Sequence, residues 1–290
     1  MSICVAVKVP EGVVLAADSA SSIAGAPTLP GGQQGPQGIV KVFYNATKAL
    51  QIRSLPVGVV CWGAGSFQVR TIASLIEEFG NEQNTKQLEA EKLSMEELAG
   101  SLWEFLLGRS DDLFEKVPRE ARPLTGLLVA GYSGDRFFPE LYRMGVPMHS
   151  PESVRPDRDG KPWFGAVWYG LTDAIVRFHH GRDDRFFEVI DQALRERSGS
   201  ADLKIDESLR ESVRGQLEYP VLFHAMPLND AVEYAEFVVD LTIKRCRFVV
   251  GAELCGGPID VATVTKQEGF AWRMRKGTRF RIGEGSHVQL

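Results

Sequence analysis

A β-hairpin that begins at residue 2 constrains this chain more than any other feature of its sequence. Residues 2–9 and 13–17 are two β-rich runs, and the Pro10-Glu11-Gly12 segment between them suits a tight turn. The first strand therefore starts directly behind the initiator methionine, with the hydroxyl of Ser2 at its beginning. The first twenty residues lack the basic start and unbroken apolar stretch of a signal peptide, and no stretch approaches the roughly 20 apolar residues that span a bilayer. We expect a cytoplasmic protein whose mature N-terminus is residue 1 or 2.

The composition excludes several classes of function. The 290 residues are 44% hydrophobic and 24% charged, which is ordinary for a globular protein able to bury a core without disulfides or metals. A formal net charge of −5 argues against a dedicated partner such as nucleic acid or an anionic membrane. The four cysteines form no C-x-x-C pair, so neither a zinc site nor a disulfide framework is indicated. We expect buried thiols, no metal and no cofactor.

The remaining pattern alternates blocks of strands with blocks of helices. The expected strands cover residues 39–44, 48–53, 57–62, 125–132, 136–142, 163–168, 259–265 and 270–273. The expected helices cover residues 66–79, 171–179 and 185–197, together with one that starts at the capping box Ser94-Met95-Glu96-Glu97 and one with Pro227 in its first turn. Residues 23–38 and 145–161 are rich in loop-forming residues. This order predicts an α+β fold with sheets in the middle and helices outside, in one domain over residues 1–290. That domain would carry an insertion near 145–162 and a basic C-terminal extension over 272–290.

Ser2 is a candidate nucleophile. A serine hydroxyl reacts poorly unless a base lies within hydrogen-bond reach. A serine at the very N-terminus carries its own base, because an α-amine with a pKa of about 7.7–8.0 is partly neutral near pH 7. Small residues in second position are commonly exposed by removal of the initiator methionine, so removal of Met1 would create this arrangement.

Several segments resemble one known family. The run SICVAVKVPEGVVLAADSAS is similar to the start of proteasome β-type subunits, which are N-terminal-nucleophile hydrolases, and the spacing from Ser2 to Asp18 matches without a gap. GIVKVF resembles the segment with the active-site lysine, VVCWGAG the segment with the oxyanion glycine, and LLVAGYSGD the central hairpin. NDAVEYAEFVVDLTIKRC and CGGPIDVATV resemble the last helix and strand. The resemblance covers roughly residues 2–80, 123–180 and 227–266, and the short start Met-Ser-Ile-Cys is most similar to the bacterial homologues called Anbu.

The resemblance implies a four-layer αββα sandwich and a set of site residues. Ser2 would be the nucleophile and its amine the base, Lys41 would place a positive charge near the hydroxyl, and Asp18 would hold Lys41 in place. The amide of Gly63 would stabilise the tetrahedral oxyanion. Tyr169 would stand where the family has a serine that completes the site.

The sequence also departs from the family pattern. Serine replaces the threonine usual at the nucleophile position, and Trp168-Tyr169-Gly170 replaces a glycine-serine-glycine segment. The expected aspartate and serine near the last strand align with Ala252 or Glu253 and with Cys255.

Three functions remain open at this point. The first is an N-terminal serine peptidase acting on peptides or unfolded proteins in a homo-oligomer, as the family resemblance implies. The second is a catalytically inactive structural or assembly relative, and the third is a small-molecule amidase of the same mechanism. A dinucleotide loop is disfavoured because the third glycine of that fingerprint would fall at Gln68, and His179-His180 lack metal partners at helical spacing.

Overall fold

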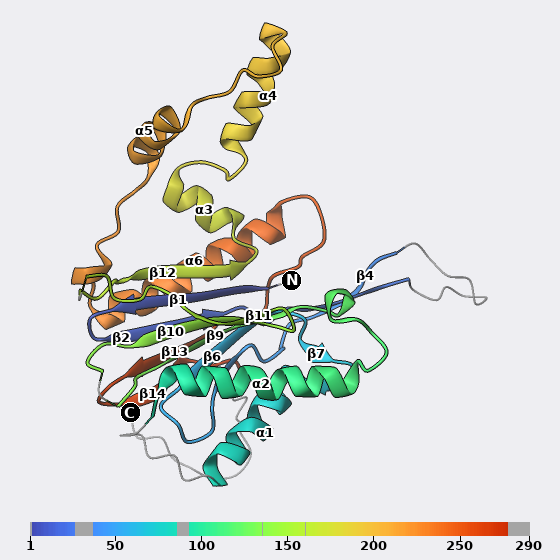
Figure 1. Cartoon of the computed structure of the whole chain (residues 1–290), viewed down its shortest axis with the longest axis vertical. Coiled ribbons are helices and arrows are strands. Elements are labelled where there is room, and N and C mark those ends of the chain that lie inside the picture. Colours follow the sequence, from blue (N-terminus) through green and yellow to red (C-terminus); the bar gives the residue numbers. More distant parts are fainter. Residues whose placement is uncertain (1, 27–36, 86–92, 135, 160, 278–290) are drawn as a thin grey trace, which may run out of the picture.

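The computed structural model describes residues 2–26, 37–85, 93–134, 136–159 and 161–277. Two antiparallel sheets of five strands each lie face to face, with helices outside both of them, so the α+β four-layer αββα expectation is confirmed (Figure 1). The first sheet has the order β12 (Gly165–Gly170), β1 (Ile3–Val9), β2 (Gly12–Ala17), β13 (Asp260–Thr265), β14 (Gly269–Met274). The second has the order β11 (His149–Ser153), β10 (Glu140–Val146), β9 (Thr125–Gly131), β6 (Gly58–Gly63), β5 (Ala49–Gln51).

The helices divide between the two outer faces. Helices α1 (Ile72–Thr85) and α2 (Met95–Leu113) cover the second sheet, while α3 (Asp173–His180) and α6 (Leu228–Phe248) cover the first. Helices α4 (Phe186–Ser198) and α5 (Glu207–Leu217) project away from the sandwich (Figure 1). The short elements are the hairpins β3 (Ser21–Gly25) with β4 (Gly38–Phe43) and β7 (Ser66–Phe67) with β8 (Arg70–Thr71), and the 3-10 turns at Arg119–Ala121 and Phe223–Ala225. None of the helices within the described ranges is long and apolar enough to cross a membrane.

Strand β1 is buried along its whole length because it lies inside the first sheet and is covered on both faces. Side chains alternate along a strand, so Ile3, Val5 and Val7 pack toward α6, while Cys4 and Ala6 pack between the two sheets. A strand covered on both faces is read from sequence as a continuous apolar run. The N-terminal hairpin is confirmed, and Ser2, which directly precedes β1, is buried.

Two helix starts follow the expected local chemistry. The side chain of Ser94 accepts a hydrogen bond from the Glu97 amide at 3.3 Å, which confirms Ser94 as the N-cap of α2. Pro227 is the N-cap of α6, one position ahead of the expected first turn, and it lacks only an N–H that a helix start leaves unpaired.

Other segments differ from the sequence-based expectations. A helix does not begin at residue 66; Gln68, at φ +50°, reverses the chain between β7 and β8, and α1 starts only at Ile72. The expected loop at 145–161 contains the edge strand β11, which pairs with β10. Of the expected loop at 23–38, residues 23–25 belong to β3, which pairs with β4, and residues 27–36 lie outside the described part of the chain. Of the expected C-terminal extension, residues 272–274 belong to β14, and residues 278–290 lie outside the described part of the chain.

Candidate active site

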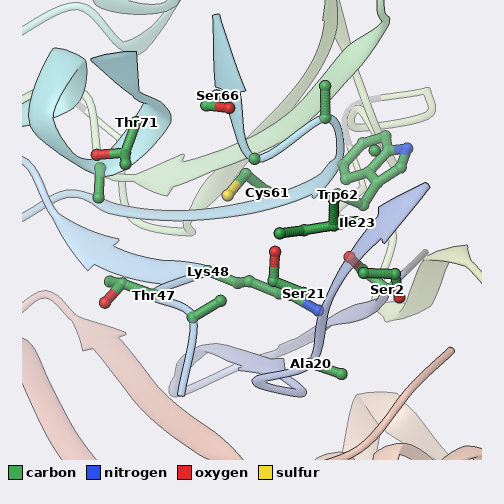
Figure 2. Close-up of a pocket in the computed structure, with 16 residues that line it drawn as sticks. Ser2, Ala20, Ser21, Ile23, Thr47, Lys48, Cys61, Trp62, Ser66 and Thr71 are labelled. Atoms are coloured by element: carbon green, nitrogen blue, oxygen red, sulfur yellow. The ribbon is translucent and has the colours of Figure 1, made fainter. Parts of the chain in front are cut away.

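Ser2 lies at a cavity of about 520 Å³. Its walls come from the residues around β3, the start of β5, the end of β6 and the β7–β8 hairpin, as Figure 2 shows. The lining residues are Ser2, Ala20, Ser21, Ser22, Ile23, Ala46, Thr47, Lys48, Cys61, Trp62, Gly63, Ala64, Gly65, Ser66, Thr71 and Ala73. The peptide group that joins Ser2 to Ile3 is held at both of its polar atoms, because the Leu171 amide donates to the Ser2 carbonyl at 2.8 Å and the Ile3 amide donates to Asp18 Oδ1 at 3.0 Å. Ser2 is 4% exposed, so this position is buried yet borders the cavity.

Asp18 anchors the base of the site. Its carboxylate is completely buried and accepts hydrogen bonds on both oxygens. The donors are the amides of Ile3, Ala20 and Gly256, each at 3.0 Å, and the Lys48 ammonium at 2.6 Å. A buried carboxylate is tolerated when it is paired with a charge and its lone pairs are satisfied, and this set of donors meets both conditions.

The lysine that contacts Asp18 is Lys48, which corrects the expectation for Lys41. Lys48 Nζ lies 2.6 Å from Asp18 Oδ1, and both side chains are almost fully buried. Lys41 is exposed on the β3–β4 hairpin, where its Nζ lies 5.7 Å from the centre of the Phe43 ring. That hairpin extends away from the sandwich (Figure 1), so it carries Lys41 away from Asp18.

The pairing of β5 with β6 brings Lys48 to the site. Lys48 directly precedes the buried strand β5, which pairs with β6, and its carbonyl accepts a hydrogen bond from the Cys61 amide at 2.9 Å. Cys61 lies two residues before Gly63, so the lysine that opens β5 is the one brought beside the end of β6. The Gly- and Pro-rich stretch after Asp18 makes chain distance a poor guide here, because an inserted hairpin changes the count without moving β5.

Gly63 ends β6 at the cavity wall. Its φ of +83° suits glycine, and a Cβ at this position would lie 2.4 Å from the Leu124 carbonyl oxygen. The Cys61 amide points from β6 toward Lys48, and amides two residues apart on a strand project from the same edge. The Gly63 amide is therefore directed to the edge on which Lys48 and the cavity lie.

Tyr169 does not line the cavity at Ser2. It pairs with Cys4 across β12 and β1 and points between the sheets, where its ring stacks on Trp62 at 4.5 Å between centroids, with 10° between the ring planes. The Arg143 guanidinium lies 5.6 Å from the centre of the Tyr169 ring. Burial raises the pKa of the Tyr169 hydroxyl, and Arg143 opposes this rise. Tyr169 thus supports Trp62, a cavity residue that the sequence analysis did not single out.

The segment after α6 also reaches Asp18. The Gly256 amide donates to Asp18 Oδ2, and burial followed by the charge of Asp18 raises the pKa of the neighbouring Cys255 thiol far above its usual range. Glu253 lies farther out and accepts a hydrogen bond from the Tyr44 hydroxyl at 3.3 Å. Cys255 therefore takes a place beside Asp18, where the family alignment has a serine.

The arrangement combines three functional groups at one cavity: a hydroxyl at the start of β1, a buried ammonium held by a carboxylate, and an amide at a glycine turn. Lys48 is the one charged residue among the described residues that line the cavity, and its charge is matched by Asp18. Such a set can activate a hydroxyl for attack on a carbonyl and stabilise the resulting oxyanion.

Comparison with known proteins supports the architecture. No family model matches the chain, and no curated protein matches its sequence. Among solved structures, a mutant of Anbu from Hyphomicrobium sp. strain MC1 is 13% identical over 91% of this chain and 82% of its own, with a TM-score of 0.51. This chain shares the fold of Anbu. At this identity the likeness to Anbu establishes the fold relationship and leaves the activity to be argued from the site.

Proposed function

We propose that the protein is an N-terminal serine hydrolase that cleaves amide bonds through an acyl-enzyme on Ser2 once Met1 is removed. One observation carries the proposal: the buried Lys48–Asp18 pair, with 2.6 Å between Nζ and Oδ1, lies at the same cavity as Ser2 and Gly63. A buried ion pair contributes little net stability, because both charges lose their hydration. Its position beside a serine and a positive-φ glycine at one cavity therefore favours a functional role.

The first half of the reaction forms the acyl-enzyme. The free α-amine of Ser2 accepts the Oγ proton as Oγ attacks the substrate carbonyl carbon. The Lys48 ammonium favours the developing negative charge near Oγ, and Asp18 keeps Lys48 charged and oriented. The Gly63 amide donates to the oxyanion of the tetrahedral intermediate, a contribution of about 2.7–4 kcal/mol for donors of this kind.

The second half releases the two products. The protonated α-amine gives its proton to the leaving amine as the C–N bond breaks, which leaves an ester between the acyl group and Ser2 Oγ. Water then attacks the ester carbonyl and gives a proton to the α-amine, and the collapse of the second intermediate returns that proton to Oγ. The acid product leaves and the starting state is restored.

The cavity favours neutral substrates. Its described lining consists of small and hydroxyl-bearing residues with Trp62 at one wall, and the Lys48 charge is already matched. A charged side chain entering it would be desolvated without a partner. We therefore propose peptides with neutral side chains at the cleavage site as substrates, in a homo-oligomeric and cytoplasmic enzyme as the family resemblance suggests.

The test begins with the intact mass of the untagged protein. Loss of Met1 alone exposes the Ser2 amine, and incubation with neutral peptide amides should then give cleavage and a trapped acyl adduct on Ser2. The variant Ser2→Ala should abolish both, whereas Ser66→Ala, which removes another hydroxyl of the same cavity, should keep them.

The same experiment separates the alternatives. Full retention of Met1, or removal of Met1 without turnover of any amide, would contradict the hydrolase and favour the structural relative. Turnover of small amides without peptides would point to an amidase with the same mechanism.

A further inference from the structure

A second cavity lies at the other end of β1 from Ser2. It has a volume of about 420 Å³, and Lys8 is among its lining residues. Lys8 lies six positions after Ser2 along the strand, which corresponds to roughly 20 Å. The apolar wall includes Phe137, Phe138 and Leu141, and the proposed hydrolase mechanism uses none of these residues.

Lys8 is a buried cation with few partners. It is 3% exposed, and its Nζ donates to the Arg155 carbonyl at 3.2 Å, while Asp157 Oδ1 lies 3.9 Å away, beyond hydrogen-bond distance. An ammonium has three N–H donors, and among the described residues the Arg155 carbonyl is its one hydrogen-bond acceptor. Burial lowers the pKa of Lys8, with Asp157 opposing. Buried polar groups are normally hydrogen-bonded. The Lys8 ammonium therefore has N–H donors next to the cavity that no described residue accepts.

The other charged groups of the cavity leave a positive balance near Lys8. Three cations and two carboxylates line it. The Arg155 guanidinium is occupied, because it donates to the Ala166 carbonyl at 2.7 Å and lies over the Trp163 ring. Glu140 is engaged by the amide and hydroxyl of Ser133.

The remaining carboxylate sits between two cations. Asp157 lies 3.9 Å from Lys8 Nζ and 3.8 Å from the Arg136 guanidinium, so it offsets both charges without a hydrogen bond to either within the described structure. Lys8 and Arg136 together can donate to one more anionic group. A planar carboxylate suits this pair because it offers two oxygens to the two donors.

We propose that this cavity binds a small carboxylate that carries an aromatic or branched apolar group. The carboxylate accepts hydrogen bonds from Lys8 and Arg136, and the apolar group packs against Phe137 and Phe138, whose rings contact each other at 4.9 Å between centroids. The combination of an apolar wall with a few convergent polar groups is typical of small-molecule sites.

The experiment uses phenylacetate as the probe, with phenylacetamide and phenethylamine as neutral and cationic analogues of the same shape. Calorimetric titration of the whole protein should show saturable binding of phenylacetate and at least tenfold weaker binding of both analogues. Lys8→Met should weaken phenylacetate binding about ten- to a hundredfold, the range for a hydrogen bond to a charged group. This variant should fold, since an apolar side chain of similar length replaces a buried charge.

Two further variants sharpen the test. Asp157→Asn removes the carboxylate that competes for Lys8 and Arg136, so it should tighten phenylacetate binding. Lys244→Met removes an exposed lysine paired with Asp240 on α6 and should leave binding unchanged. The proposal is overturned if phenylacetate fails to bind, if phenylacetamide binds equally well, or if Lys8→Met binds like the parent protein. None of these results depends on hydrolase activity, so the two proposals stand or fall separately.

Discussion

Replacement of Lys48 by methionine tests the central ion pair of the site. The Asp18 carboxylate is fully buried, and Lys48 is its one charged hydrogen-bond partner in the described structure. Removing one member of a buried pair costs about 3–5 kcal/mol, because the other charge is left without its counterion. The three backbone amides that remain on Asp18 keep part of its solvation, so we expect a loss near the lower limit, about 3 kcal/mol in the free energy of unfolding.

Lys41→Met is the matched control for this substitution. Lys41 is exposed, and its contact with the Phe43 ring at 5.7 Å is of a kind worth about 0.5–1 kcal/mol at the surface. Urea unfolding of both variants should therefore separate them by about 2 kcal/mol or more, with Lys48→Met the less stable. The double variant Asp18→Asn, Lys48→Met should lose less than the sum of the single losses, with a coupling of about 1–3 kcal/mol.

The reasoning is refuted by either of two results. In the first, the free energy of unfolding of Lys48→Met lies within about 1 kcal/mol of that of the parent protein. In the second, Lys41→Met is destabilised as much as Lys48→Met. Amide hydrolysis provides a second readout, and it should fall with Lys48→Met and persist with Lys41→Met.

Three further predictions address other parts of the molecule. Gly63→Ala should lower the free energy of unfolding by about 1–3 kcal/mol and abolish hydrolysis, because Gly63 has φ +83° and an added Cβ would lie 2.4 Å from a backbone oxygen. Gly65→Ala is the control in urea unfolding and should be close to neutral, because an added Cβ there meets nothing within 4 Å. Burial lowers the pKa of His179, so the unfolded chain binds a proton at this residue more readily than the folded protein does. The free energy of unfolding should therefore fall as the pH drops from about 6.5 toward the lower folded pKa, and His179→Gln should flatten this part of a stability–pH profile. Ser94→Ala should cost about 1 kcal/mol by thermal unfolding, since Ser94 caps α2, and an unchanged melting temperature would contradict that role.

Local sequence chemistry was sufficient for several elements. The apolar runs around a Pro-Glu-Gly turn predicted β1 and β2, and Ser94 followed by glutamates predicted the start of α2, because turns and caps depend on residues close together in the chain. The N-cap Asp206 of α5 carried the same kind of signal, and this helix was missed.

The structure brings three of the candidate site residues close together. Ser2 and Gly63 line one cavity, and Asp18 accepts a hydrogen bond from the amide of Ile3, the residue after Ser2. These three residues sit at the ends of strands β1, β2 and β6, whose apolar patterns are strong. The catalytic roles of these residues stay predictions until hydrolysis is measured.

The choice between Lys41 and Lys48, and the direction of Tyr169, depended on the tertiary structure. Both lysines precede or lie in β-rich segments, and only the pairing of β5 with β6 decides which ammonium reaches Asp18. Tyr169 faces the space between the sheets because of its register with Cys4, and a shift of one residue would turn it to the other face.

The sequence by itself thus determined the N-terminal hairpin, the starts of α2 and α6, the α+β class and the strand ends where Ser2, Asp18 and Gly63 lie. Only the tertiary structure decided which charges meet, both at Asp18 with Lys48 and at Lys8 with Asp157. The physical reason is that turns, caps and apolar periodicity act over a few residues, whereas a buried ion pair forms between segments far apart in the chain, where strand register sets the distance.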